Sequence, residues 1–399
     1  MLSLSSKFAL LLDHLAVVFT VILVSFLCFF IVLIIDSLIR KRHTSRYGAI
    51  LLQDLSLSRH WLFRCFRTAF LSVAVLGISL ITTSIRRSFT DASSFSFSQS
   101  LWHALFSVIN IHLTLALNKF VCGNSLHELY WPRSTVGWIS LSNAKKPCVI
   151  KRKGHPFSIK FITIFLIVVG THSITPLLFS LFRCFNGFDC VPYVSGTLLR
   201  GILFFVVQQL WLFVNGVDEE TSWRGFVRVL FEKENKADGH VGHSPIVMYL
   251  VSGSVYALCH SLNQSFDSLS MGIMYFNLIC EGAVWMFLFK KTDDLCLNWI
   301  LHHVDDLASI WFGTSSLAAY ALPEGQICPW NVGDCNQFIN GGEFGIGASL
   351  LYIGQNLWTL IVILVLNQSY FRFKPKGSLH QYKSSQTLND GPFSFENGD

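Results

Sequence analysis

A continuous apolar run near the start of the chain places the strongest constraint on its fold. The run extends from Phe8 to Ile35, and Asp13 is its one charged residue. A helix needs about 20 apolar residues to cross the hydrocarbon core of a bilayer. The run is also longer than the apolar region of a signal peptide, which spans about 7–15 residues. We therefore predict an uncleaved membrane-spanning helix at this position.

The composition extends this conclusion to the whole chain. Hydrophobic residues make up 52% of the 399 residues and charged residues only 14%, whereas soluble domains carry about 25% charged residues. So few charges cannot cover the surface of a soluble enzyme of this size. The composition also excludes a disordered chain, a coiled coil and a nucleic-acid-binding domain.

Eight further apolar stretches are candidates for membrane spans. They are continuous and lack alternation with a period of two, so helices are expected instead of the strands of a closed barrel. The expected fold class is an all-α, polytopic transmembrane helical bundle with about eight or nine spans. The further spans are expected near residues 62–85, 101–121, 158–182, 197–217, 244–262, 268–289, 295–320 and 344–366.

The positions of Lys and Arg predict the orientation of the chain in the membrane. Basic residues are frequent in segments 36–61 and 119–160 and in the C-terminal tail, and segment 321–343 contains none. Because cytoplasmic segments are enriched in Lys and Arg, nine spans place the N-terminus outside and the C-terminus in the cytoplasm. Segment 86–100 carries Arg86 and Arg87 and is the one expected outer loop that departs from this pattern.

Two pairs of cysteines fall in expected outer loops. Cys184 and Cys190 form one pair, and Cys328 and Cys335 form the other. Disulfides are expected if that side of the membrane is oxidising. Free buried thiols are the equally weighted alternative.

Three clusters of ionisable residues interrupt the apolar second half of the chain. Such residues are costly at membrane depth and therefore mark candidate functional positions. The clusters read EETSWRG at 219–225, YALCH at 256–260 and HHVDD at 302–306.

The spacing within these clusters is helical. Glu220 and Arg224 are four residues apart, so they can pair along one helix face, and His302 and Asp306 share that spacing. Glu219 points about 100° away from Glu220 and is expected to face another partner. Carboxylates and imidazoles on three helices form a candidate general-base site, in which a carboxylate takes a proton from water.

The site can assemble only if one helix is longer than its apolar core. Glu219 would otherwise lie at one end of its span and His260 near the opposite end of the next span. The apolar sequence after Gly216 allows the helix to continue to about Leu230. We expect this longer helix, which places Glu219 near the middle of the membrane.

In this order, the three clusters resemble the signature of the CAAX protease and bacteriocin-processing (CPBP) family. That signature is EExxxR, then an aromatic residue four positions before a His, and then His-x-x-x-Asn/Asp. The family includes the eukaryotic type II CAAX prenyl endopeptidases, and the resemblance covers roughly residues 195–320. It implies an intramembrane protease of the glutamate type. We expect no cofactor and no metal at the site.

The resemblance also implies a role for each residue. Glu219 would activate water with the help of His260, and His302 would form an oxyanion hole with the residue four positions later. That residue is Asp306, where the prenyl endopeptidases have Asn, and an ionised Asp cannot donate to an oxyanion. Asp306 is therefore either protonated or orients His302 instead. The implied catalytic residues are Glu219, His260, His302 and Asp306, and the implied site-shaping residues are Glu220, Arg224 and Tyr256.

Three regions follow from this reading. Residues 1–150 form an N-terminal transmembrane segment of unknown role, 151–370 form the CPBP-like protease domain, and 371–399 form a polar cytoplasmic tail. The expected partners are membrane lipid and a peptide or prenylated protein substrate such as a C-terminal CAAX sequence, but no nucleic acid. The expected location is the plasma membrane of a bacterium or the endoplasmic reticulum membrane of a eukaryote.

Three other functions remain open at this point. A zinc-dependent membrane metalloprotease is one alternative, because Glu and His can ligate zinc, although no HExxH sequence is present. A non-catalytic membrane scaffold or immunity protein with the same fold is another. A transporter with a Glu and His proton relay is the third.

Overall fold

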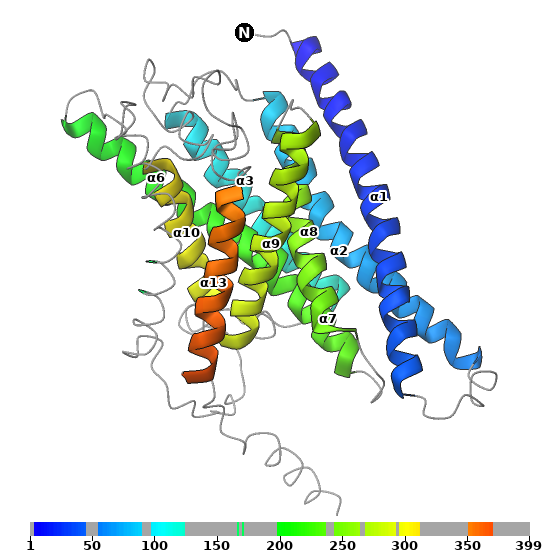
Figure 1. The fold of residues 1–399 in the computed structure, drawn as a ribbon. Coiled ribbons are helices and arrows are strands. Elements are labelled where there is room, and N and C mark those ends of the chain that lie inside the picture. The colour runs from blue at the N-terminus through cyan, green and yellow to red at the C-terminus, as the bar shows by residue number, and fades with distance from the viewer. Residues whose placement is uncertain are drawn as a thin grey trace, which may run out of the picture.

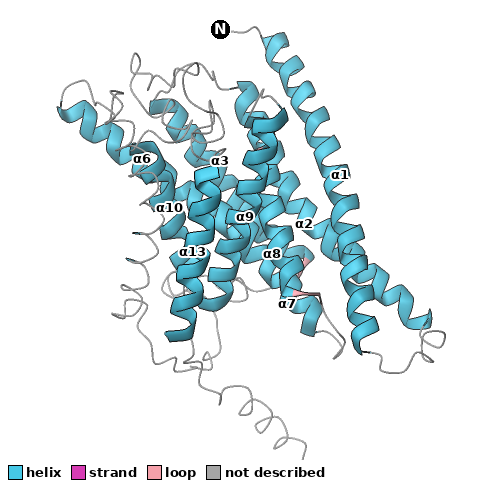
Figure 2. Cartoon of the chain, in the orientation of Figure 1, coloured by secondary structure: helices cyan, strands magenta, loops and turns pink. Residues whose placement is uncertain are grey.

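The computed structural model shows a bundle of long helices (Figure 1). Within the part of the chain that the structure describes there is no strand (Figure 2), which confirms the all-α fold class. The predicted span at 158–182, the two cysteine pairs and the tail 371–399 lie outside the described residues, apart from 166 and 170. The described residues are 4–44, 55–89, 97–123, 166, 170, 198–236, 243–263, 268–292, 295–311 and 350–369.

Three of the long helices that the structure describes lie before residue 124. Helix α1 (Leu4–Thr44) packs along α2 (Leu55–Phe89) at one edge of the bundle (Figure 1). Helix α3 (Phe97–Ala116) contacts α2 and ends in a π-helical turn, η1 (Leu117–Val121). Much of the apolar surface of α1 is exposed, as expected for a helix that faces lipid.

The helix that carries the first cluster is continuous from residue 198 to residue 236. It consists of α6 (Leu198–Glu220), a π-helical turn η3 (Thr221–Phe226) and α7 (Val227–Lys236). Its backbone stays helical at both junctions, and every residue of η3 is buried. The prediction that this helix continues past Gly216 to about Leu230 is therefore confirmed. Single π-helical turns occur frequently at functional sites.

Two helices cross closely at a pair of glycines. Helix α8 (Pro245–Cys259) is capped at its N-terminus by Ser244. The Ser244 side chain accepts a hydrogen bond from the Ile246 amide. A Cβ atom at Gly253 would collide with a backbone carbonyl of α9 (Ser268–Thr292), and a Cβ atom at Gly282 would lie 2.6 Å from the Gly253 Cα. Small residues let membrane helices approach in this way.

Two further helices complete the described bundle. Helix α10 (Leu295–Trp311) packs on α6 and α9, and α13 (Leu350–Ser369) packs on α9. A short 3₁₀ turn, η5 (Ser261–Asn263), follows α8. The chain is an integral membrane protein, with four described helices long and apolar enough to cross a bilayer. Their apolar segments are Leu4–Ile39, Trp61–Phe89, Leu101–Val121 and Met271–Lys291.

Candidate active site

Glu220 is the buried anchor of the site. Its side chain is fully buried, and one carboxylate oxygen lies 2.9 Å from Arg224 Nη1 and 2.8 Å from His302 Nδ1. Its other oxygen accepts a hydrogen bond from Asn298 Nδ2 at 3.1 Å. The predicted pair of Glu220 and Arg224 is therefore present, and two residues of α10, His302 and Asn298, join it. A buried carboxylate needs several such donors to offset its desolvation.

His302 bridges two carboxylates of the α6 helix. Its Nε2 atom lies 3.0 Å from Glu219 Oε2, while Nδ1 lies beside Glu220. Asp306, one turn later on α10, lies 3.7 Å from the same Nε2 atom. Because an ionised carboxylate only accepts hydrogen bonds, His302 donates to both glutamates when they are ionised and both of its ring nitrogens carry hydrogen. The imidazole thus joins α10 to the end of α6.

Glu219 is held at both oxygens. Asn215, one turn earlier on α6, donates to Oε1 at 2.8 Å, and His302 contacts Oε2. The side chain of Glu219 is 14% exposed, whereas that of Glu220 is fully buried. The two glutamates therefore differ as their helical spacing predicts, since one faces a partly open space and the other faces the core.

His260 ends α8 with a defined hydrogen bond. Its Nδ1 atom lies 2.9 Å from the Tyr256 carbonyl oxygen. A carbonyl can only accept, so Nδ1 carries the hydrogen, and the neutral ring has its lone pair on Nε2. The imidazole also packs edge-on against the Tyr256 ring at 5.1 Å and lies 6.2 Å from the Trp223 ring.

Tyr256 connects the first two clusters. The Arg224 guanidinium lies 4.4 Å from the centre of the Tyr256 ring, within cation–π range. The Tyr256 hydroxyl donates to Glu281 on α9 at 3.4 Å. These contacts link Arg224 of the first cluster through Tyr256 to α9.

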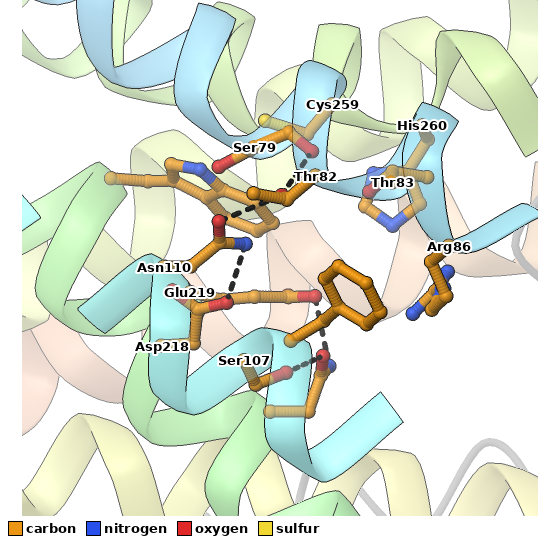
Figure 3. A pocket seen from close by; sticks show the side chains of 13 residues that line it. Ser79, Thr82, Thr83, Arg86, Ser107, Asn110, Asp218, Glu219, Cys259 and His260 are labelled. Carbon is orange, nitrogen blue, oxygen red and sulfur yellow. Dashed lines mark hydrogen bonds between the residues drawn. The ribbon is translucent and has the colours of Figure 1, made fainter. Parts of the chain in front are cut away.

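Glu219 and His260 line a common cavity (Figure 3). Its volume is about 80 Å³, well above the roughly 10–15 Å³ that one water needs. Among the described residues, the lining includes neither His302 nor Asp306, which lie behind Glu219 on α10. The full lining consists of Ser79, Thr82, Thr83, Arg86, Phe106, Ser107, Asn110, Asn215, Asp218, Glu219, Trp223, Cys259 and His260.

The N-terminal helices supply one wall of this cavity. Asn110 of α3 donates to Asp218 at 3.1 Å, and Thr82 of α2 donates to Asn110 at 2.7 Å. Ser222 donates to the other oxygen of Asp218 at 3.3 Å. Figure 3 shows this chain of hydrogen bonds from α2 across α3 to α6. Helices from the region that the sequence left without a role thus contact the candidate site.

Several residues that line the cavity lie outside the three sequence clusters. Asn215 could have been identified from the sequence, because it lies four residues before Glu219 and so shares its helix face. Asp218 directly precedes the paired glutamates. Asn110 and Arg86 carry no such signal, since only the packing of α2 and α3 on α6 brings them to the cavity.

The described residues contain no group of three or more His, Cys, Asp or Glu side chains arranged to hold a metal ion. The clustered acids instead meet amide, hydroxyl, guanidinium and imidazole donors, as at Asp218, Glu219 and Glu220.

In the comparison with known families, all three clusters lie within one matched region. Residues 201–308 match the family model described as type II CAAX prenyl endopeptidase Rce1-like. The match begins in α6 and ends in α10, so it includes Glu219, His260 and His302. No curated protein and no solved structure matches the chain at the threshold of the comparison.

Proposed function

We propose that the chain is a membrane-embedded endopeptidase, because residues 201–308 match the family model described as type II CAAX prenyl endopeptidase Rce1-like. Its proposed substrates are peptides such as the C-terminal CAAX sequences of prenylated proteins. The observation that carries the proposal is the shared cavity of Glu219 and His260, in which a carboxylate and an imidazole meet a space large enough for water. The substrate class itself is supported by the family.

The proposed reaction is hydrolysis with a water activated by Glu219. The carboxylate takes a proton from the water, while His260 Nε2 accepts a hydrogen bond from that water and orients it. The resulting hydroxide adds to the carbonyl carbon of the scissile peptide bond. Glu219 then returns the proton to the departing nitrogen as the carbon–nitrogen bond breaks. The water is consumed, and the products are a carboxylic acid and an amine.

His302 acts in this proposal as a positioning residue for Glu219. Its contact with Oε2 and the Asn215 contact with Oε1 hold the carboxylate in one orientation. The oxyanion role that the resemblance implies for His302 and Asp306 requires Nε2–H to turn from Glu219 to the substrate. Glu220 and Arg224 hold His302 and Tyr256 in place from behind.

The proposed location follows from the substrate class. A prenyl chain partitions into lipid, so the peptide that carries it reaches the bundle from the membrane surface. In a eukaryotic cell the proposed membrane is that of the endoplasmic reticulum, and in a bacterial cell it is the plasma membrane.

Product identification by mass spectrometry tests the proposed function. Purified protein is incubated with a farnesylated CAAX peptide, and the release of the last three residues is followed. The wild type is expected to release this tripeptide, and His260→Ala is expected to release it at least tenfold more slowly, within the range of general acid–base contributions. Absence of any cleaved peptide, combined with retained binding of a partner protein, would favour the scaffold alternative.

A chelator separates the glutamate mechanism from the zinc alternative. Treatment with 1,10-phenanthroline is expected to leave the tripeptide release unchanged. Loss of activity that zinc restores would contradict the glutamate mechanism and support a metalloprotease.

A further inference from the structure

The proposed reaction needs a hydrogen-bond donor for the oxygen of the scissile carbonyl. A peptide cleaved with Glu219 and His260 has this carbonyl in the cavity that both side chains line (Figure 3). The two ring nitrogens of His302 already face the carboxylates of Glu219 and Glu220. Among the described residues, the cavity lining includes neither His302 nor Asp306. The donor is therefore expected among the residues of the cavity wall itself.

Trp223 has a donor of this kind. It lines the cavity, and the residue is 4% exposed. Its indole nitrogen, Nε1, has no hydrogen-bond partner, and among the described residues it is the one buried polar side-chain atom of the cavity lining in this state. An indole N–H only donates, and buried donors in native proteins are nearly always paired. The missing partner is thus an acceptor that a ligand can supply.

The amide and guanidinium donors of the cavity wall are already engaged within the protein. Asn110 donates to Asp218, and Asn215 donates to Glu219. Arg86 donates to a histidine of α3. These groups hold the acids and the helices in place. The indole differs from them, because its N–H group has no partner.

The surrounding helices fix the position of Trp223. Its backbone carbonyl, in the buried turn η3, accepts a hydrogen bond from the Ser252 hydroxyl of α8 at 2.7 Å. The indole packs against the Tyr256 ring with 5.1 Å between ring centres, and its centre lies 6.2 Å from that of the His260 ring. The Arg224 guanidinium lies 5.8 Å from the indole centre. A donor held in this way needs little reorganisation when negative charge develops beside it.

We propose that the indole N–H group of Trp223 binds the oxygen of the scissile carbonyl and stabilises the oxyanion that forms there. This inference rests on the proposed function. When hydroxide adds to the carbonyl carbon, an electron pair moves to the oxygen, and the hydrogen bond from Nε1 becomes charge-assisted. The indole keeps its proton throughout. When the carbon–nitrogen bond breaks, the electron pair returns to form the carbonyl of the acid product, and the proton that Glu219 took from water passes to the nitrogen.

Replacement of the indole by an isostere tests the inference. 3-Benzothienylalanine at position 223 keeps the shape of the side chain and has sulfur in place of the N–H group. We expect kcat for tripeptide release from a farnesylated CAAX peptide to fall about 100- to 1,000-fold with little change in KM, as for loss of one oxyanion donor. Trp223→Phe should lose at least as much. A wild-type kcat in the isostere variant would overturn the inference.

The matched control removes an indole elsewhere in the bundle. Trp358 is exposed on α13 and lies outside the cavity lining. Trp358→Phe should therefore retain the wild-type kcat and KM. If Trp223→Phe loses activity while the isostere variant retains it, the loss arises from packing and the inference fails.

Binding of a transition-state analogue separates an oxyanion donor from a packing role. The probe is the same peptide with a phosphonamidate in place of the scissile amide, whose tetrahedral anionic group resembles the oxyanion. The isostere should weaken phosphonamidate binding about 100- to 1,000-fold. The affinity for the unmodified peptide, measured in Glu219→Gln protein with and without the isostere, should change little. An equal loss for both ligands would show that Trp223 only packs the site, and would overturn the inference.

Turnover by the wild type separates this inference from the proposed function. A wild type that releases no tripeptide contradicts the proposed function, and the inference fails with it. A wild type and an isostere variant that cleave at the same rate leave the proposed function standing, and only the role of Trp223 fails.

Discussion

His302 Nε2 lies 3.0 Å from Glu219 Oε2, and this contact joins the third sequence cluster to the first. The contact fixes one oxygen of the candidate base from α10, while Asn215 fixes the other from within α6. A carboxylate held at both oxygens keeps its orientation before a substrate arrives. Such preorganisation is a principal source of enzymatic rate enhancement.

Removal of Asn215 tests this holding role. Asn215→Ala leaves Oε1 of Glu219 without its donor, so the carboxylate can turn away from the cavity. We expect kcat to fall about 10- to 100-fold with little change in KM, since small displacements of catalytic groups have costs of this order. Steady-state kinetics of peptide cleavage measures both constants. An unchanged kcat in a correctly folded variant would show that Asn215 does not position the base.

Loss of the buried cation should destabilise the protein. Arg224→Leu leaves the Glu220 carboxylate buried without its guanidinium partner. The free energy of unfolding is expected to fall by about 3–5 kcal/mol, as for other broken buried ion pairs. Thermal unfolding in detergent measures the loss. The double variant Arg224→Leu/Glu220→Gln should recover part of it, and strictly additive losses would contradict the pairing.

The crossing of α8 and α9 should not tolerate a methyl group. In Gly253→Ala, the new Cβ atom meets the Ile279 carbonyl, so the helices must separate. We expect a loss of about 1–3 kcal/mol, the usual cost of overpacking. Gly272→Ala, on α9, is the matched control, because a Cβ atom there meets nothing within 4 Å. Equal melting temperatures for the two variants would argue against the close crossing.

The hydrogen bond from α3 to Asp218 is expected to stabilise the protein and support cleavage. Asn110→Ala removes the donor to Asp218 and the acceptor for Thr82. Buried polar groups that lose a partner cost about 1–3 kcal/mol, so both the melting temperature and the cleavage rate should fall. Leu113→Ala, at an exposed position of the same helix, is the control. A variant as stable and active as the control would show that the N-terminal helices are not part of the site.

The sequence predicts the features of this protein that depend on local rules. Long apolar runs specify helices in a membrane, and a spacing of four residues specifies which side chains share a face, as for Glu220 and Arg224. The continuation of the helix beyond Gly216 was also predictable, because the following residues are apolar.

Contacts between distant helices could not be predicted from spacing. The meeting of Asn110 with Asp218 depends on how α3 packs against α6, and the place of Arg86 depends on extra residues at the end of α2. Sequence clusters likewise do not distinguish Glu219 and His260, which line the cavity, from His302, which lies behind Glu219. These distinctions arise from tertiary packing alone.

The most direct test of the central claim compares wild-type protein with Glu219→Gln. Glutamine preserves the size of the side chain and can still accept from Asn215, but it cannot take a proton from water. We predict that the rate of tripeptide release from a farnesylated CAAX peptide falls by at least about 100-fold, within the range of general-base contributions, while the affinity for the peptide is retained. Undiminished cleavage by Glu219→Gln would contradict the assignment of Glu219 as the base.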